Sequence, residues 1–212
     1  MNEIRWTFWD AALVSRTLMA SKEIEDHWDA PSALPQFAVR GLCGHLVRAT
    51  TSVAFYLTRE VPHGVPVSTR ARYYAEATGE PDIASEIHAK IRAKGEEMAR
   101  AGQAELLARY DDGLKSIRSA LDREPEDRKV LVYRNVVLLL DDYLATRVVE
   151  LAVHIDDLAV SIGSPTPEIP ALALSTARDV LIEVARLRHG DLALVRALAR
   201  RERDEPNALR VL

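Results

Sequence analysis

Apolar side chains recur at steps of three and four residues along most of this chain, which is the spacing of one face of an α-helix. Ala, Leu, Arg and Glu are abundant and aromatic residues make up only 6% of the chain, so intrinsic propensity also favours helix. With 212 residues, 48% of them apolar, the chain can bury the core of one domain, or of one domain with a small appendage. The sequence therefore predicts an all-α protein.

Proline- and glycine-rich stretches divide this pattern into separate helices. The helices are predicted at residues 4–26, 37–57, 81–110, 143–162, 169–189 and 191–203, with a short one at 70–77. The Asp-Asp-Gly triplet at 111–113 is expected to interrupt the third helix before it continues towards Pro125. Four long helices with additional short ones indicate a bundle, in which functional sites are built from side chains on facing helices.

The helix at 143–162 is the best defined in the chain, because its helical periodicity is long and both ends carry local signals. Asp141 or Asp142 is expected to be its N-cap, and Gly163 is expected to end it. The preceding residues 129–140 are rich in valine, and we expect them to be strand or loop.

Charge and hydropathy exclude several classes of protein. The chain has 28 basic and 32 acidic residues and a formal charge of −4, so it has no overall attraction for nucleic acid or for an anionic membrane. The longest apolar stretches, such as 136–140, are too short to span a bilayer, and the first twenty residues carry Arg5, Asp10 and Arg16 where a signal peptide is apolar. We expect a soluble, cytoplasmic protein with neither nucleic acid nor membrane as a partner.

The single cysteine limits how a metal can be bound. Cys43 alone forms neither an internal disulfide nor a cysteine cage, so any metal must be held by histidine and carboxylate. Cys43 is two positions from His45 and on another side of the helix, and we expect it to pack in the core. Four other histidines are expected to be solvated: His27, His63, His88 and His189.

The most informative local pattern is Glu150-Leu-Ala-Val-His154. Four residues along a helix place this carboxylate and this imidazole one turn apart on the same face, where they can share a metal ion. His45 is the natural third ligand, because it lies on the apolar stripe of the 37–57 helix. The alternative is a surface hydrogen-bonded pair, since Glu and His occur at this spacing by chance in many helices.

Polar residues around this pair form a stripe on the 143–162 helix. The stripe consists of Tyr143, Arg147, Glu150, His154, Asp157 and Ser161. Its side chains follow steps of three and four residues, so it either faces solvent or lines a functional cavity.

Two stretches of the chain carry a resemblance to a known family. They are WDAPSALPQFAVRGLCGHL at 28–46 and DYLATRVVELAVHIDDLA at 142–159. In order, residue type and separation they resemble the metal-binding domain of mycothiol-dependent maleylpyruvate isomerases, part of the DinB-like group. The resemblance implies a four-helix bundle with an up-down-down-up layout, which we place at residues 1–163. The helical pattern of residues 164–212 predicts a C-terminal extension packed on the bundle.

The resemblance also implies a metal site and its chemistry. A divalent metal, commonly zinc, would be held by His45, Glu150 and His154; nickel, iron and manganese also suit two imidazoles and one carboxylate. The cofactor thiol, mycothiol or another small thiol, would bind the metal as a thiolate and attack a small electrophile. The implied function is a metal-dependent enzyme for S-transfer or isomerisation.

Two charged residues beside the implied ligands are candidate catalytic residues. Arg147 would hold a carboxylate of the thiol or of the substrate, and Asp157 would orient a ligand from behind. In the alternative, the two charges compensate each other and have a structural role.

The chain departs from the family pattern before the second helix and after the last one. Gln36-Phe37 stand where the family usually has Gly-Trp, and Ala38 stands where a hydroxyl residue caps the helix, which weakens that helix start by about 1 kcal/mol. The isomerases carry a separate C-terminal domain, whereas residues 164–212 read as two helices here.

These departures leave a second function open. In it, the protein is a non-catalytic metal-binding bundle with a structural or regulatory role, whose terminal helices contact a protein partner or a second copy. A homodimer is compatible with such a bundle, and no sequence feature defines an interface. The arginines at 196, 200, 201 and 203 alternate with acidic residues and favour a solvated helix over a nucleic-acid contact.

Overall fold

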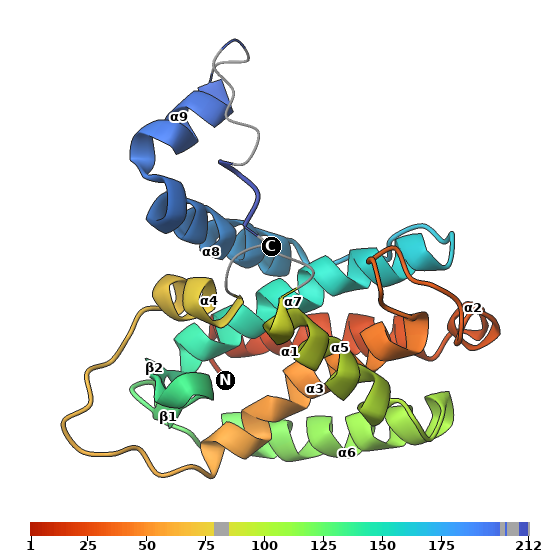
Figure 1. Ribbon diagram of the computed structural model, residues 1–212. Coiled ribbons are helices and arrows are strands. Elements are labelled where there is room, and N and C mark those ends of the chain that lie inside the picture. Colours follow the sequence, from red (N-terminus) through yellow and green to blue (C-terminus); the bar gives the residue numbers. More distant parts are fainter. Residues whose placement is uncertain (79–84, 200–201, 203–207, 212) are drawn as a thin grey trace.

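Four long helices form the centre of the protein (Figure 1). They are α1 (Glu3–Met19), α3 (Val39–Leu57), α6 (Gln103–Leu121) and α7 (Leu140–Ser161). The structure, a computed structural model, describes the chain except residues 79–84, 200–201, 203–207 and 212. Within the described residues, no helix has both the length and the apolar character needed to cross a bilayer.

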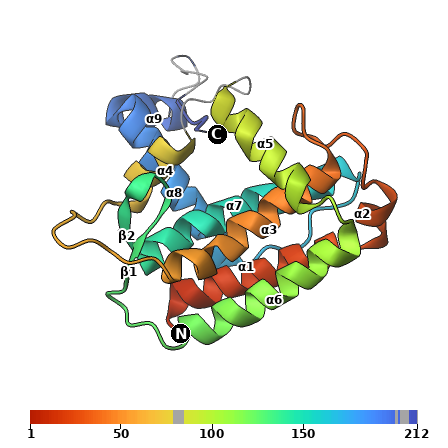
Figure 2. The same ribbon diagram turned by 60° about the horizontal axis from the view of Figure 1, so that its bottom comes forward.

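Contacts between the helix ends define the direction of each helix. Arg5, near the start of α1, donates to the carbonyl of Leu121 at the end of α6 and to the carboxylate of Asp141 at the start of α7. Ser52, late in α3, contacts Tyr143, early in α7. Thus α1 and α7 run one way and α3 and α6 the other, as Figure 2 also shows. The predicted up-down-down-up bundle is confirmed.

The core lies between the apolar faces of these four helices. Fully buried side chains include Phe8 of α1, Leu46 of α3, Ile117 of α6 and Ile155 of α7. Each belongs to a run with helical spacing, so the periodicity of the sequence identifies the buried faces correctly.

The remaining elements surround the bundle. They are α2 (Lys22–Asp26), α4 (Arg70–Thr78), α5 (Glu86–Met98), α8 (Ala171–His189), α9 (Asp191–Ala199), β1 (Lys129–Leu131) and β2 (Val137–Leu139). The two strands pair antiparallel with Val130 opposite Leu138, which confirms the extended conformation expected at 129–140. A 3-10 turn at Tyr133–Asn135 joins them.

The C-terminal helices pack directly on the bundle. Ala145 and Val149 of α7 share a second apolar cluster with Val180 and Val184 of α8. Because α7 contributes one face to the bundle core and another to this cluster, it joins the two parts. The division of the chain at residue 163 stays a prediction.

Two predicted helix boundaries are wrong. The helix expected at 4–26 breaks after Met19, because the side chain of Ser21 accepts from the Ile24 amide and starts α2 as a new helix. The break expected at 111–113 is instead at Ala99 to Gly102, where Gly102 has a positive φ of 92°. The helix start expected at 81 and the part of the last helix beyond Ala199, with the arginines at 200, 201 and 203, lie outside the described residues.

The predicted aspartate cap of α7 is also wrong. The N-cap is Leu139, whose side chain makes no capping bond. Asp141 instead accepts hydrogen bonds from the side chains of Asn2 and Arg5 at the start of α1. Because its carboxylate is held there, it does not cap α7, the helix to which it belongs.

The start of α3 lacks a side-chain cap, as expected from Ala38. The preceding loop replaces this cap. The amide of Val39 donates to the carbonyl of Ala30 and the amide of Arg40 donates to the carbonyl of Trp28, each at 3.0 Å. Two of the unpaired amides at this helix end are thereby satisfied by backbone instead of a hydroxyl. The loop between residues 28 and 38 therefore anchors the helix that carries His45.

Candidate metal centre

Three side chains from two helices meet inside the bundle. His45 projects from α3, and Glu150 and His154 project from α7. Nε2 of His45 lies 3.0 Å from Oε2 of Glu150, and Nε2 of His154 lies 3.5 Å from the same oxygen. One donor atom from each residue lies within 4.8 Å of the other two. Among the described residues this is the only group of at least three histidine, cysteine or acidic side chains with this geometry.

The donor set fits a divalent metal. Bonds of about 2.0–2.1 Å in a tetrahedral arrangement separate neighbouring ligand atoms by roughly 3.3 Å. The two distances to Oε2 of Glu150, 3.0 and 3.5 Å, bracket this value. Two imidazole nitrogens and one carboxylate oxygen are also the ligand types of catalytic zinc sites, which leave a fourth position open.

Asp157 holds His154 from behind. Its Oδ2 lies 2.8 Å from Nδ1 of His154, so the proton on Nδ1 is shared with the carboxylate and Nε2 faces Glu150. Burial opposes the charged form of His154, but the hydrogen bonds to Asp157 and Glu150 outweigh it and raise the pKa to about 9. Asp157 therefore fixes which ring nitrogen of His154 faces Glu150.

Glu150 is held on both of its oxygens. The hydroxyl of Tyr74, from α4, donates to Oε1 at 2.8 Å, and the guanidinium of Arg147 lies 3.9 Å from the same oxygen. Burial alone would raise the pKa of Glu150, but the hydrogen bonds with His154 and His45 and the charge of Arg147 hold it well below its usual value. The carboxylate is therefore ionised, with Oε2 turned towards both histidines.

Tyr74 is the contact that the sequence does not reveal. It lies in the short helix α4, and its side chain is fully buried. A tyrosine in a short helical segment gives no signal in the sequence for a contact with a carboxylate 76 positions further along the chain.

Arg147 and Asp157 do not compensate each other. Arg147 approaches Glu150 and lies over the ring of Tyr143, with 5.0 Å between the guanidinium carbon and the ring centre. Asp157 contacts His154. The middle of the polar stripe is thus interior, with Arg147 and Glu150 each 12% exposed.

His45 is held less completely than His154. Its Nε2 contacts Glu150, while its Nδ1 is buried without a hydrogen-bond partner. Burial lowers the pKa of His45, and the nearby His154 contributes in the same direction. The ring is therefore neutral and presents a lone pair or a proton at Nε2 according to what binds there.

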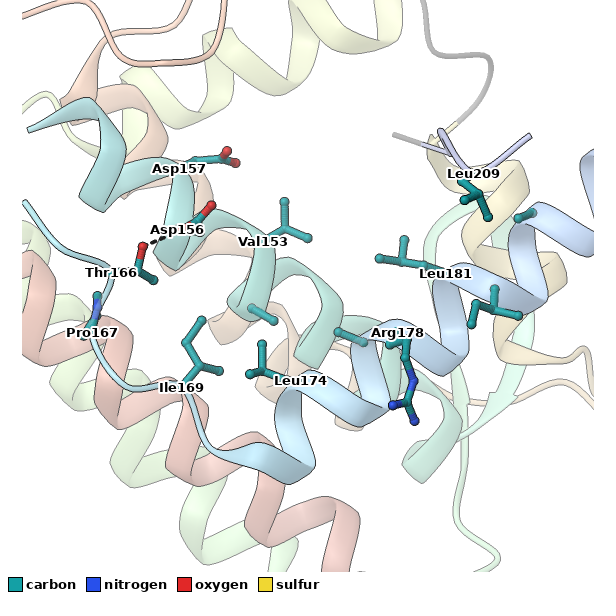
Figure 3. Close-up of a pocket in the computed structure, with 14 residues that line it drawn as sticks. Val153, Asp156, Asp157, Thr166, Pro167, Ile169, Leu174, Arg178, Leu181 and Leu209 are labelled. Carbon is teal, nitrogen blue, oxygen red and sulfur yellow. Dashed lines mark hydrogen bonds between the residues drawn. The ribbon is translucent and has the colours of Figure 1, made fainter. Parts of the chain in front are cut away.

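A cleft of about 630 Å³ opens between α7 and α8, next to the stripe (Figure 3). Its walls are mainly apolar, with Val153 of α7 and Leu174 and Leu181 of α8, while Asp156 and Asp157 lie towards one end. Val153 and Asp157 are four residues apart and share the face of α7 that lines the cleft, while the carboxylate of Asp157 also contacts His154. Asp157 is therefore shared between the cleft and the three clustered side chains.

The other candidate residues lie away from this centre. Cys43 is fully buried in the core, as expected, and burial raises the pKa of its thiol to about 12. His27, His63 and His189 are exposed, as expected. His88 is an exception, because it is half-buried and its Nε2 is shielded from solvent without a partner.

The fold and the site together define a class: an all-α bundle with a candidate metal centre of two histidines and one glutamate between two antiparallel helices. The family model described as mycothiol maleylpyruvate isomerase N-terminal domain matches residues 9–159. The chain belongs to this family, which confirms the resemblance carried by its two motifs. No curated protein and no solved structure gives a significant match.

Proposed function

We propose that the protein is a metal-dependent enzyme that activates a low-molecular-weight thiol, of the mycothiol type, for S-transfer or isomerisation of a small electrophile. The observation that carries this proposal is the convergence of His45, Glu150 and His154 at distances suited to one ion. Family membership over residues 9–159 supports it.

The residues around the site have complementary roles in this proposal. Tyr74 and Arg147 engage Oε1 of Glu150, so that Oε2, which faces both histidines, would bind the metal together with them. Asp157 orients His154 so that Nε2 is available as a ligand. A divalent metal bound there would stabilise a coordinated thiol in its thiolate form, which is the nucleophile.

The surroundings supply space for reactants. The apolar cleft beside Asp157 would accept the apolar part of the thiol or of the electrophile. We propose zinc as the metal, with nickel, iron and manganese as the other ions that suit this donor set. A single free cysteine, Cys43, agrees with the reducing conditions of the cytoplasm, where we place the protein.

Metal content and a thiol titration test the proposal. Purified wild type should hold close to one metal per chain after incubation with zinc and dialysis, and His45→Ala and Glu150→Gln should lose it. His189→Ala, an exposed histidine on α8, is the matched control and should keep it. In the cobalt-substituted protein, an added thiol should produce a thiolate-to-cobalt absorption band.

The outcomes separate the two functions considered for this bundle. Wild-type protein that takes up neither zinc, nickel, iron nor manganese would overturn the proposal. Metal that binds firmly but never gains a thiolate ligand would favour a structural or regulatory metal site.

A further inference from the structure

Arg48 lies one turn beyond His45 on α3. Residues three positions apart on a helix share a face, with their Cβ atoms about 5–6 Å apart. Ser52, one turn further along, contacts Tyr143 of α7, so this face of α3 is the one that meets the candidate metal centre.

Arg48 has no counter-ion in the part of the chain that the structure describes. It is half-buried, and its Nε is shielded from solvent without a hydrogen-bond partner. A guanidinium carries five donors and stays charged at any pH a protein meets, so leaving one unpaired and partly buried is unfavourable. The most direct compensation is a bound anion.

The other arginine of the site is already engaged. Arg147 lies over Tyr143 and near Glu150, and its side chain is only 12% exposed. Of these two arginines, Arg48 is therefore the one available to bind an anionic ligand. The sequence pattern instead predicts Arg147 as the residue that holds a carboxylate of a reactant.

The sum of the formal charges around the site also favours the binding of an anion. Among the described residues around the site, with a divalent metal bound, the charged side chains are two arginines, Arg48 and Arg147, and two carboxylates, Glu150 and Asp157. The excess of two positive charges equals the charge of one thiolate and one carboxylate.

We propose that Arg48 binds a carboxylate carried by one of the two reactants, which makes it a specificity-determining residue of the proposed site. The inference rests on the proposed function, in which a thiol and an electrophile meet at the metal. A planar guanidinium pairs with a carboxylate through two parallel hydrogen bonds and discriminates against an amide of the same shape. The carboxylate belongs either to the thiol or to the electrophile.

Binding measurements on the metal-loaded protein test this assignment. The first probe pair is 3-mercaptopropionate and its amide, titrated by calorimetry. The second is succinate and its diamide, titrated into protein saturated with 2-mercaptoethanol. We expect wild type to bind the carboxylate of one pair at least about tenfold more tightly than the amide, a difference typical of a charge-assisted hydrogen bond.

The variants identify the residue responsible. Arg48→Gln should abolish the preference, Arg48→Lys should keep part of it, and Arg109→Gln, at an exposed arginine on α6, should leave it unchanged. Metal content and the circular dichroism spectrum of Arg48→Gln should match wild type, which excludes a loss through misfolding. If Arg48→Gln does not fold, the assignment depends on Arg48→Lys, which must then lower the preference.

The result also shows which reactant carries the anion. A preference within the thiol pair places the carboxylate on the thiol, and one within the succinate pair places it on the electrophile. Wild type with no preference in either pair, or a preference that survives in Arg48→Gln, would overturn the assignment. Succinate binding that depends on Arg48 in a protein that binds no thiol would retain the anion site and contradict the proposed function.

Discussion

Asp157 and His154 form a hydrogen-bonded pair one turn apart on α7, with 2.8 Å between Oδ2 and Nδ1. Because Nδ1 contacts this carboxylate, Nε2 is the nitrogen of the imidazole that faces Glu150. Asp157 also lines the apolar cleft. A residue behind a metal ligand normally affects the affinity of the site without touching the ion.

Asp157→Asn should therefore weaken zinc binding by about 10- to 100-fold while the protein stays folded. The asparagine keeps the size of the side chain but loses the charge that favours the proton on Nδ1. Competition with a fluorescent zinc chelator measures the change. Asp156→Asn, at the neighbouring carboxylate that contacts Thr166, is the control, and an equal loss in both variants would contradict the role of Asp157.

Tyr74→Phe should lower the free energy of unfolding of the metal-free protein by about 2 kcal/mol, the usual contribution of a hydrogen bond to a charged group. Burial, and then the charge of Glu150, raise the pKa of Tyr74 well above its usual value, so its hydroxyl stays protonated and donates. Urea denaturation measures the change. Tyr73→Phe is the matched control, since that hydroxyl makes no hydrogen bond in the described part of the chain; a similar loss there would refute the prediction.

Gly44→Ala should destabilise the protein by about 1–3 kcal/mol, the range for overpacking a close contact. Helices α3 and α5 cross so closely that a Cβ on Gly44 would collide with the backbone carbonyl of Gly95. Without that contact, replacing a helical glycine by alanine stabilises, so the sign of the change is decisive. His45 is the next residue, and zinc affinity should fall in the same variant.

Gln36→Gly should stabilise the protein by about 1 kcal/mol. Gln36 has a positive φ of 61°, the left-handed region in which glycine has no steric penalty. The variant loses the hydrogen bond between Arg92 and the Gln36 side chain, but that contact is exposed and contributes little. A thermal melt that shows a lower midpoint than wild type would disprove the argument.

Cys43 should not react with Ellman's reagent in the native protein and should react fully in guanidinium chloride. The side chain is fully buried, and burial raises its pKa to about 12, so at pH 8 it is neither accessible nor ionised. Reaction within minutes under native conditions would show that the bundle opens around α3.

The helices and the three clustered side chains were predictable because they depend on local spacing. Glu150 and His154 share a face in any helix, and His45 lies on the apolar stripe of another helix, where an imidazole needs a partner. The structure brings the three together by turning the polar stripe of α7 towards α3. The boundaries were less accurate where tertiary contacts replaced local caps, as at Asp141, which binds Arg5 instead of capping α7.

The sequence by itself determined the class of fold, the family and the residues of the candidate centre. Only the tertiary structure decided what surrounds them: Tyr74 on Glu150, the close crossing at Gly44 and Gly95, and an Arg48 that has no counter-ion among the described residues. The physical reason is that helical periodicity depends on neighbours three or four positions away. A hydrogen bond or a missing ion pair depends instead on which distant elements the packing of the whole chain brings into contact.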